Sequence, residues 1–188
     1  MKVVSRLIIG LIVIITINSC KYECDGFPNH ELAWIPYEIG EKIKYTNGLD
    51  TIEFEVVDYA KTEPDYFRGL VMDYECSYEG YYSTDESKNY YIKEKLNNGW
   101  KDSGMKVWLS DNDLFHFYML GQNETSDSLT IEFMTDLNIE GIMYNDVYKV
   151  TKNKPIDLNR ILWIIKARDK GIVQFYDKKL EEKWTLIE

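Results

Sequence analysis

The stretch TIEFEVV, residues 51–57, decides the fold class of this chain. Apolar side chains at 52, 54 and 56 alternate with polar ones at 51, 53 and 55, and a period of two residues is typical of a half-buried β-strand. The stretch SLTIEFM, residues 128–134, repeats the pattern with Leu129, Ile131 and Phe133 on one face. These two segments predict sheets with one face in the core.

Further strands are expected along the rest of the chain, separated by turn residues such as Asn47-Gly48, Glu79-Gly80 and Lys170-Gly171. Helix is expected only as single turns within residues 28–39 and 135–141. The predicted fold is mainly β: a single antiparallel, meandering β-sandwich or partly open β-barrel over residues 27–188, with few short helices. The other expected strands are residues 41–46, 66–78, 81–95, 105–109, 114–120, 146–151, 161–167, 172–177 and 183–187.

The first twenty residues, MKVVSRLIIGLIVIITINSC, have the layout of a secretory signal, with a short basic segment followed by an apolar run. The segment resembles a bacterial lipoprotein signal, in which the cysteine becomes the lipidated first residue. This resemblance implies that residues 1–19 are removed and that Cys20 carries the lipid. An ordinary cleaved signal peptide and an uncleaved anchor are the alternatives. The anchor is disfavoured because a spanning helix needs about 20 apolar residues and this run is shorter.

Charge and composition exclude several classes of function. The chain has 32 acidic and 22 basic residues and a net charge of −10, which disfavours nucleic acid as a partner because phosphate binding needs clustered Lys and Arg. Acidity of this kind favours solubility; a cation site is the alternative, but the acidic residues lack metal-ligand spacing. We predict no metal site and no cofactor.

Cys24 and Cys76 remain as a pair if Cys20 is lipidated. In an oxidising compartment we expect them to form a disulfide, with two free thiols as the alternative. Closing a loop of this length stabilises a fold by about 4 kcal/mol in the chain-entropy model. The tether, residues 20–26, would then be short, since Cys20 and Cys24 can be separated by only about 14 Å.

Both ends of the body are similar to small uncharacterised lipoproteins from Bacteroidetes. The similar segments are Phe27-Pro28, YEIGEKIKY at 37–45, YNDVY at 144–148, KGIVQF at 170–175 and WTL at 184–186. The resemblance implies a β-rich domain held by its lipid in the cell envelope, at the outer membrane, and it implies no activity. Thr51 and Ser128 lie in Asp-Thr-Ile and Asp-Ser-Leu segments, which resemble the O-glycosylation acceptors of exported proteins from the same group.

Catalytic motifs are absent from the sequence. The two histidines are His30 and His116, and neither accompanies a nucleophile elbow such as GxSxG. We interpret His116 as a hydrogen-bonded histidine on the same strand face as Leu114 and Tyr118; a general base in an apolar pocket is the alternative. We predict no catalytic residue.

Six tyrosines gather between residues 74 and 91, and this is the one compositional excess. Tyr78, Tyr82 and Tyr90 could form a binding surface for an envelope protein or glycan, whereas aromatic pairing within the sheet is the plainer interpretation. The sequence therefore predicts a membrane-anchored envelope lipoprotein with a non-catalytic binding or accessory role. The alternatives are a carrier or sensor of an apolar ligand inside a β-barrel and a carboxylate-dependent hydrolase of envelope glycans.

Overall fold

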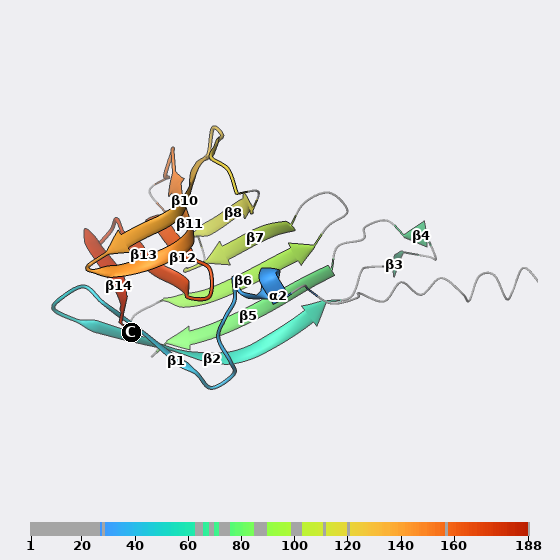
Figure 1. The fold of residues 1–188 in the computed structure, drawn as a ribbon, viewed down its shortest axis with the longest axis horizontal. Helices are drawn as coiled ribbons and strands as arrows, with labels where there is room; N and C mark the ends of the chain where they lie inside the picture. Colours follow the sequence, from blue (N-terminus) through green and yellow to red (C-terminus); the bar gives the residue numbers. More distant parts are fainter. Residues whose placement is uncertain are drawn as a thin grey trace, which may run out of the picture.

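One antiparallel sheet of twelve strands forms the body of the protein in a computed structural model (Figure 1). The structure describes residues 27, 29–62, 66–67, 70–71, 76–84, 90–98, 103–110, 112–119, 121–156 and 158–187. The strands of this sheet are β1 (Lys42–Thr46), β2 (Thr51–Thr62), β5 (Cys76–Thr84), β6 (Tyr91–Asn98), β7 (Ser103–Trp108), β8 (Leu114–Tyr118), β9 (Glu124–Thr125), β10 (Leu129–Ile139), β11 (Ile142–Lys152), β12 (Ile161–Ala167), β13 (Gly171–Asp177) and β14 (Glu182–Ile187). Two short strands, β3 (Tyr66–Phe67) and β4 (Leu70–Val71), pair with each other, and the helix α2 (Asn29–Leu32) is a single turn.

The strand order is β8-β7-β6-β5-β2-β1-β14-β13-β12-β11-β10-β9. Two meanders therefore meet in the middle of the sheet, where β1 pairs with β2 on one side and with the last strand, β14, on the other. The predicted mainly-β, antiparallel fold with little helix is confirmed.

The sheet curves until its two arms face each other. The ring of Phe117 on β8 lies 5.6 Å from that of Tyr148 on β11, and Lys152 at the end of β11 contacts Asp113, which precedes β8, at 2.7 Å. These strands are not hydrogen-bonded neighbours, and the outermost strands β8 and β9 do not pair. The sheet is thus not closed into a barrel.

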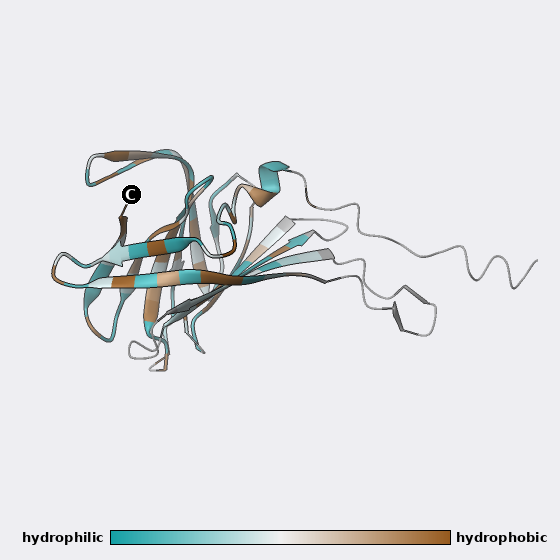
Figure 2. Cartoon of the chain, turned by 90° about the horizontal axis from the view of Figure 1, so that it is seen from below, coloured by the Kyte–Doolittle hydropathy of each residue, from teal (hydrophilic) through white to brown (hydrophobic). Residues whose placement is uncertain are grey.

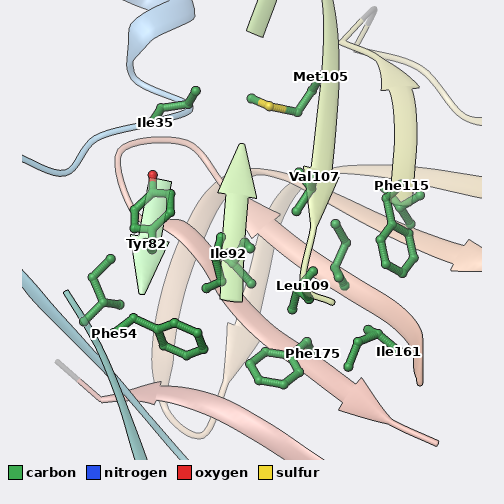
Figure 3. Close-up of a cluster of buried hydrophobic side chains, with 14 of the residues drawn as sticks. Ile35, Phe54, Tyr82, Ile92, Met105, Val107, Leu109, Phe115, Ile161 and Phe175 are labelled. Carbon is green, nitrogen blue, oxygen red and sulfur yellow. The ribbon is translucent and has the colours of Figure 1, made fainter. Parts of the chain in front are cut away.

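Large apolar side chains fill the inside of this curve. The alternation predicted in residues 51–57 is confirmed, because Ile52, Phe54 and Val56 are all buried; alternating apolar and polar segments are visible along the strands in Figure 2. Side chains from both arms converge there, as Phe54, Ile92 and Phe175 do in Figure 3. The largest fully buried aromatic side chains are Tyr45, Phe54, Phe115, Phe117, Tyr148 and Phe175.

The expected helical turn at residues 135–141 is wrong, because the segment belongs to the β10–β11 hairpin. Leu137 pairs with Tyr144 and Ile139 with Ile142. Ile139 and Tyr144 are buried in a second apolar cluster, and Glu140 at the tip reaches Lys183 on β14 at 3.4 Å. Gly141, which bounded the expected helical turn, instead adopts φ 93° at the hairpin tip, and burial of Ile139 and Tyr144 stabilises the two strands.

The expected turn at Glu79-Gly80 is also wrong, since both residues lie inside β5 and pair with β2 and β6. Glycine is needed at this position for packing. A Cβ on Gly80 would lie 2.9 Å from Cε1 of Tyr59. The single strand expected over residues 66–78 is likewise replaced by β3, β4 and the start of β5.

The N-terminal segment packs across one end of the curved sheet. Trp34 and Ile35 are buried in the main core, the Asp169 amide donates to the Ala33 carbonyl at 2.7 Å, and the Tyr37 hydroxyl donates to the Lys170 carbonyl. Predictions for Cys20 and Cys24 lie outside the described residues, as does the side chain of Cys76 at the start of β5.

Candidate functional site

The tyrosines predicted as a binding surface line the inside of the sheet instead. Tyr82 and Tyr90 are 2% and 5% exposed; Tyr82 donates to Glu94 at 2.8 Å, and Tyr90 donates to Asp177. Tyr78 is half-buried and stacks on Tyr59, with ring centroids 5.1 Å apart. The predicted surface is therefore wrong for Tyr82 and Tyr90, because strand alternation turns them inward and leaves odd-numbered residues of β5 facing out.

The outward face of β5–β8 carries basic and aromatic side chains, and we call it the basic-aromatic face. The register sets the side chains in two rows, one running from Glu79 through Lys95 and Lys106 to His116, the other from Tyr81 through Lys93 to Trp108. The face consists of Glu79, Tyr81, Lys93, Lys95, Lys106, Trp108, His116 and Tyr118.

Glu79 organises the basic-aromatic face. Its carboxylate accepts from Lys95 at 2.8 Å, from Lys93 at 3.0 Å and from the Tyr81 hydroxyl at 2.6 Å. Burial by itself would raise the pKa of Glu79, but the bonds from Lys95, Tyr81 and Lys93 outweigh it and lower the pKa to about 2. The carboxylate is therefore ionised at neutral pH and holds both ammonium groups at the sheet surface.

Lys93 lies between two aromatic rings. Its Nζ is 4.9 Å from the centroid of Tyr81 and 5.2 Å from that of Trp108, a geometry in which the ring quadrupoles attract the cation. Burial would lower the pKa of Lys93, but the hydrogen bond with Glu79 reverses this and raises it. The side chain is thus charged and held in one position.

Three lysines against one glutamate give this face an excess of positive charge in a chain of net charge −10. Lys106 lies opposite Lys95 in the register and has no carboxylate across from it on either neighbouring strand. His116 and Tyr118 are exposed, and their rings lie 5.5 Å apart. His116 therefore lies on an open sheet surface, not in the apolar pocket that a buried general base would need. Anions and flat rings are the ligands that such a face can bind.

Acidic side chains inside the sheet are already occupied by cations. Lys166 donates to Glu94, Arg160 donates through Nε to Asp177, and Lys152 donates to Asp113 at 2.7 Å. The three carboxylates are at most 1% exposed. A glycosidase needs two carboxyl groups reached by substrate and water, so these carboxylates serve the fold.

Two recesses lie on either side of the β12–β13 turn and share Asp169 and Lys170. One has a volume of about 250 Å³ and includes Glu41 and Lys42; the other has a volume of about 350 Å³ and includes Arg168. Their charged linings differ from the enclosed apolar space that a carrier of an apolar ligand would need. The inside of the sheet is packed with aliphatic and aromatic side chains (Figure 3).

Thr51 and Ser128 are both exposed, at the start of β2 and just before β10. Their positions leave room for the expected O-glycosylation, which stays a prediction. Among the residues that the structure describes, no three His, Cys, Asp or Glu side chains gather as metal ligands. That part of the chain also has no helix with the length and apolar character to cross a membrane.

No protein-family model, curated protein or solved structure matches this chain. The support for the candidate site is therefore its geometry alone. The sequence does contain a signal for the basic-aromatic face. Three pairs of basic or aromatic residues have members two positions apart, namely Lys93 and Lys95, Lys106 and Trp108, and His116 and Tyr118. What the sequence lacks is the register that aligns these pairs.

Proposed function

We propose that this protein is a lipid-anchored binding lipoprotein of the cell envelope, without catalysis of its own, and that it binds anionic glycans through the basic-aromatic face. The observation that carries the proposal is the alignment of Lys95 and Lys106 beside Trp108 and Tyr118 on adjacent strands. The anchor is supported by the arrangement of the basic segment, the apolar run and Cys20.

Charge and ring chemistry favour an acidic sugar polymer as the ligand. Lysine ammonium groups donate to carboxylate or phosphate oxygens from several directions, and the half-buried Trp108 and exposed Tyr118 offer apolar ring area beside them. The bonds of Lys93 and Lys95 with Glu79 fix the lysines before binding, which reduces the entropy lost on association. An envelope protein as ligand is the alternative from the sequence.

Titration with a polyuronate and with a matched neutral polysaccharide tests the glycan proposal. We expect the polyuronate alone to bind, to quench tryptophan fluorescence and to weaken as salt rises. Lys106→Gln and Trp108→Ala should each weaken binding by about tenfold, corresponding to about 1.4 kcal/mol. Lys149→Gln, on β11 outside this face, is the matched control. Equal binding of both polymers, or unchanged binding by Lys106→Gln, would contradict the proposal.

Cell fractionation tests the anchor separately. Replacing Cys20 with Ala should move the exported protein from the membrane fraction to the soluble fraction, because a lipid cannot attach to alanine. Unchanged retention in the membrane fraction would contradict lipidation and leave the glycan proposal standing.

A further inference from the structure

Three consecutive loops along one end of the sheet expose aliphatic side chains, and we call this end the distal rim. The loops are residues 47–50 between β1 and β2, residues 178–181 between β13 and β14, and residues 153–160 between β11 and β12. They are consecutive because the strand order runs β2-β1-β14-β13-β12-β11. The Lys178 amide donates to the Arg160 carbonyl at 2.8 Å, which joins two of the loops directly.

Each loop presents a large aliphatic residue to solvent. Leu49 is 95% exposed, Leu158 69%, Ile156 59% and Leu180 47%. Single exposed apolar residues are ordinary, whereas a group of them on neighbouring loops marks an interaction site.

One exposed aliphatic residue in each loop donates its backbone N–H to the side-chain oxygen of a residue two or three positions away. The backbone N–H of Leu49 donates to Oδ1 of Asn47 at 2.9 Å, that of Ile156 to Oδ1 of Asn159 at 3.0 Å, and that of Leu180 to Oδ1 of Asp177 at 3.0 Å. The backbone N–H groups of Leu49, Ile156 and Leu180 are therefore held by hydrogen bonds to side chains close by in the sequence. These amides are satisfied internally, which removes the cost of bringing an unpaired N–H into an apolar medium.

From this geometry we propose that the distal rim docks onto a lipid bilayer, with Leu49, Ile156, Leu158 and Leu180 entering the acyl boundary. Protein interfaces favour Trp, Tyr and Arg as anchors, and leucine is under-represented among them. The rim instead offers the aliphatic side chains of Leu and Ile with exposed lysines beside them, Lys154 near Ile156 and Lys178 and Lys179 next to Leu180. Lysines that flank aliphatic side chains inserted at the acyl boundary lie at the level of the lipid phosphates.

The acidic residues of the same loops are Asp50, Asp157 and Glu181, so the rim is close to neutral overall. Apolar insertion is therefore expected to supply most of the affinity, and anionic lipid to add a smaller, salt-sensitive part.

The chain enters the domain at the opposite end. Phe27 packs on Tyr78, with ring centroids 6.3 Å apart, and Tyr78 pairs with Lys61 near the far end of β2, which begins at the distal rim. The distal rim thus faces away from the N-terminal segment. If Cys20 is lipidated, as proposed above, the bilayer reached by the rim is a second surface and not the one that holds the anchor.

Sedimentation with heavy vesicles tests the proposal. The full chain, purified from membranes and held in light vesicles by its own N-terminus, is mixed with sucrose-loaded vesicles of phosphatidylethanolamine and phosphatidylglycerol. We expect the light vesicles to sediment with the heavy ones. Joint substitution of Leu49, Ile156, Leu158 and Leu180 by Ser should weaken the affinity for the heavy vesicles by at least about 100-fold. Each buried aliphatic side chain contributes about tenfold to that affinity.

Ile142→Ser with Met143→Ser is the matched control, because these exposed residues lie at the β10–β11 tip, at the other end of the sheet. This variant should sediment like the parent.

Retained folding of the rim variant with four serines is checked by its urea unfolding midpoint. If that variant does not fold, Leu180→Trp is used, and its fluorescence should be quenched by brominated lipid in the heavy vesicles. Failure of the parent to sediment, equal loss in the control, or an unquenched Trp would overturn the proposal. Rim-dependent cross-linking to an envelope protein without vesicle binding would overturn it in favour of a protein partner.

Discussion

Lys166 on β12 donates a hydrogen bond to the carboxylate of Glu94 on β6, across the inside of the curved sheet. Both side chains are at most 1% exposed, and the Tyr82 hydroxyl donates to the other oxygen of Glu94 at 2.8 Å. Burial lowers the pKa of Lys166 despite the opposing effect of Glu94. Because β6 and β12 are not neighbours in the sheet, this ion pair links its two arms.

Removing the cation from this pair should destabilise the fold. Lys166→Met leaves Glu94 buried without a counter-charge, and we expect a loss of about 3–5 kcal/mol in the free energy of unfolding, measured in urea. Glu94→Gln in the Lys166→Met background should recover part of the loss, because an amide can still accept from Tyr82 without a buried charge. A loss below about 1 kcal/mol in Lys166→Met would show that the pair contributes little.

The stability contributed by Glu79 should depend on pH. Its pKa is about 2 in the folded protein, against an ordinary value of 4.5. A carboxyl group with a lowered folded-state pKa stabilises the fold fully above about pH 4.5, and the contribution declines as the pH falls toward 2. Glu79→Gln should therefore unfold at lower urea than the parent at pH 7, and the difference between the two midpoints should narrow between pH 5 and pH 3. A difference between the two midpoints that stays constant with pH would show that ionisation of Glu79 is not the source of its stabilising effect. The exposed Glu55, substituted by Gln, is the control and should change stability little.

Gly171 should tolerate alanine poorly. It adopts φ 68° at the start of β13, and a Cβ there would lie 2.6 Å from Cε2 of Tyr37. Gly171→Ala therefore adds a steric clash to the cost of a left-handed backbone, which is about 1–2 kcal/mol. Gly48→Ala, at φ 92° with no heavy atom within 4 Å of its Cβ, carries the backbone cost alone. The thermal unfolding midpoint of Gly171→Ala should be lower than that of Gly48→Ala. Equal midpoints would show that the clash with Tyr37 adds no cost.

Cys24 and Cys76 are expected to form a disulfide in the exported protein. Peptide mapping by mass spectrometry without reduction should detect the two peptides joined, and reduction should lower the free energy of unfolding by up to about 4 kcal/mol. Free thiols at both positions would refute the bridge and leave the sheet topology unaffected.

Local periodicity predicted the fold class because it depends only on neighbouring residues. Ile52, Phe54 and Val56 all point into the core, as their alternation requires. The adjacent residues Tyr81 and Tyr82 place one ring on each face, as the two-residue period of a strand requires, with Tyr82 buried and Tyr81 half-buried. The sequence did not reveal that Tyr82 and Tyr90 lie on the inner face, because the alternation within β5 and β6 does not identify which side the rest of the chain will cover.

The sequence by itself determined a mainly-β, antiparallel chain of net negative charge with little helix, since composition and spacing carry that information. Only the tertiary structure decided that β14 pairs with β1, that Glu94 meets Lys166, and that Leu49, Leu180 and Ile156 lie on consecutive loops of one rim. Each of these contacts joins residues far apart in the chain. Their partners are fixed by strand register and by the curvature of the whole sheet, neither of which any local stretch encodes.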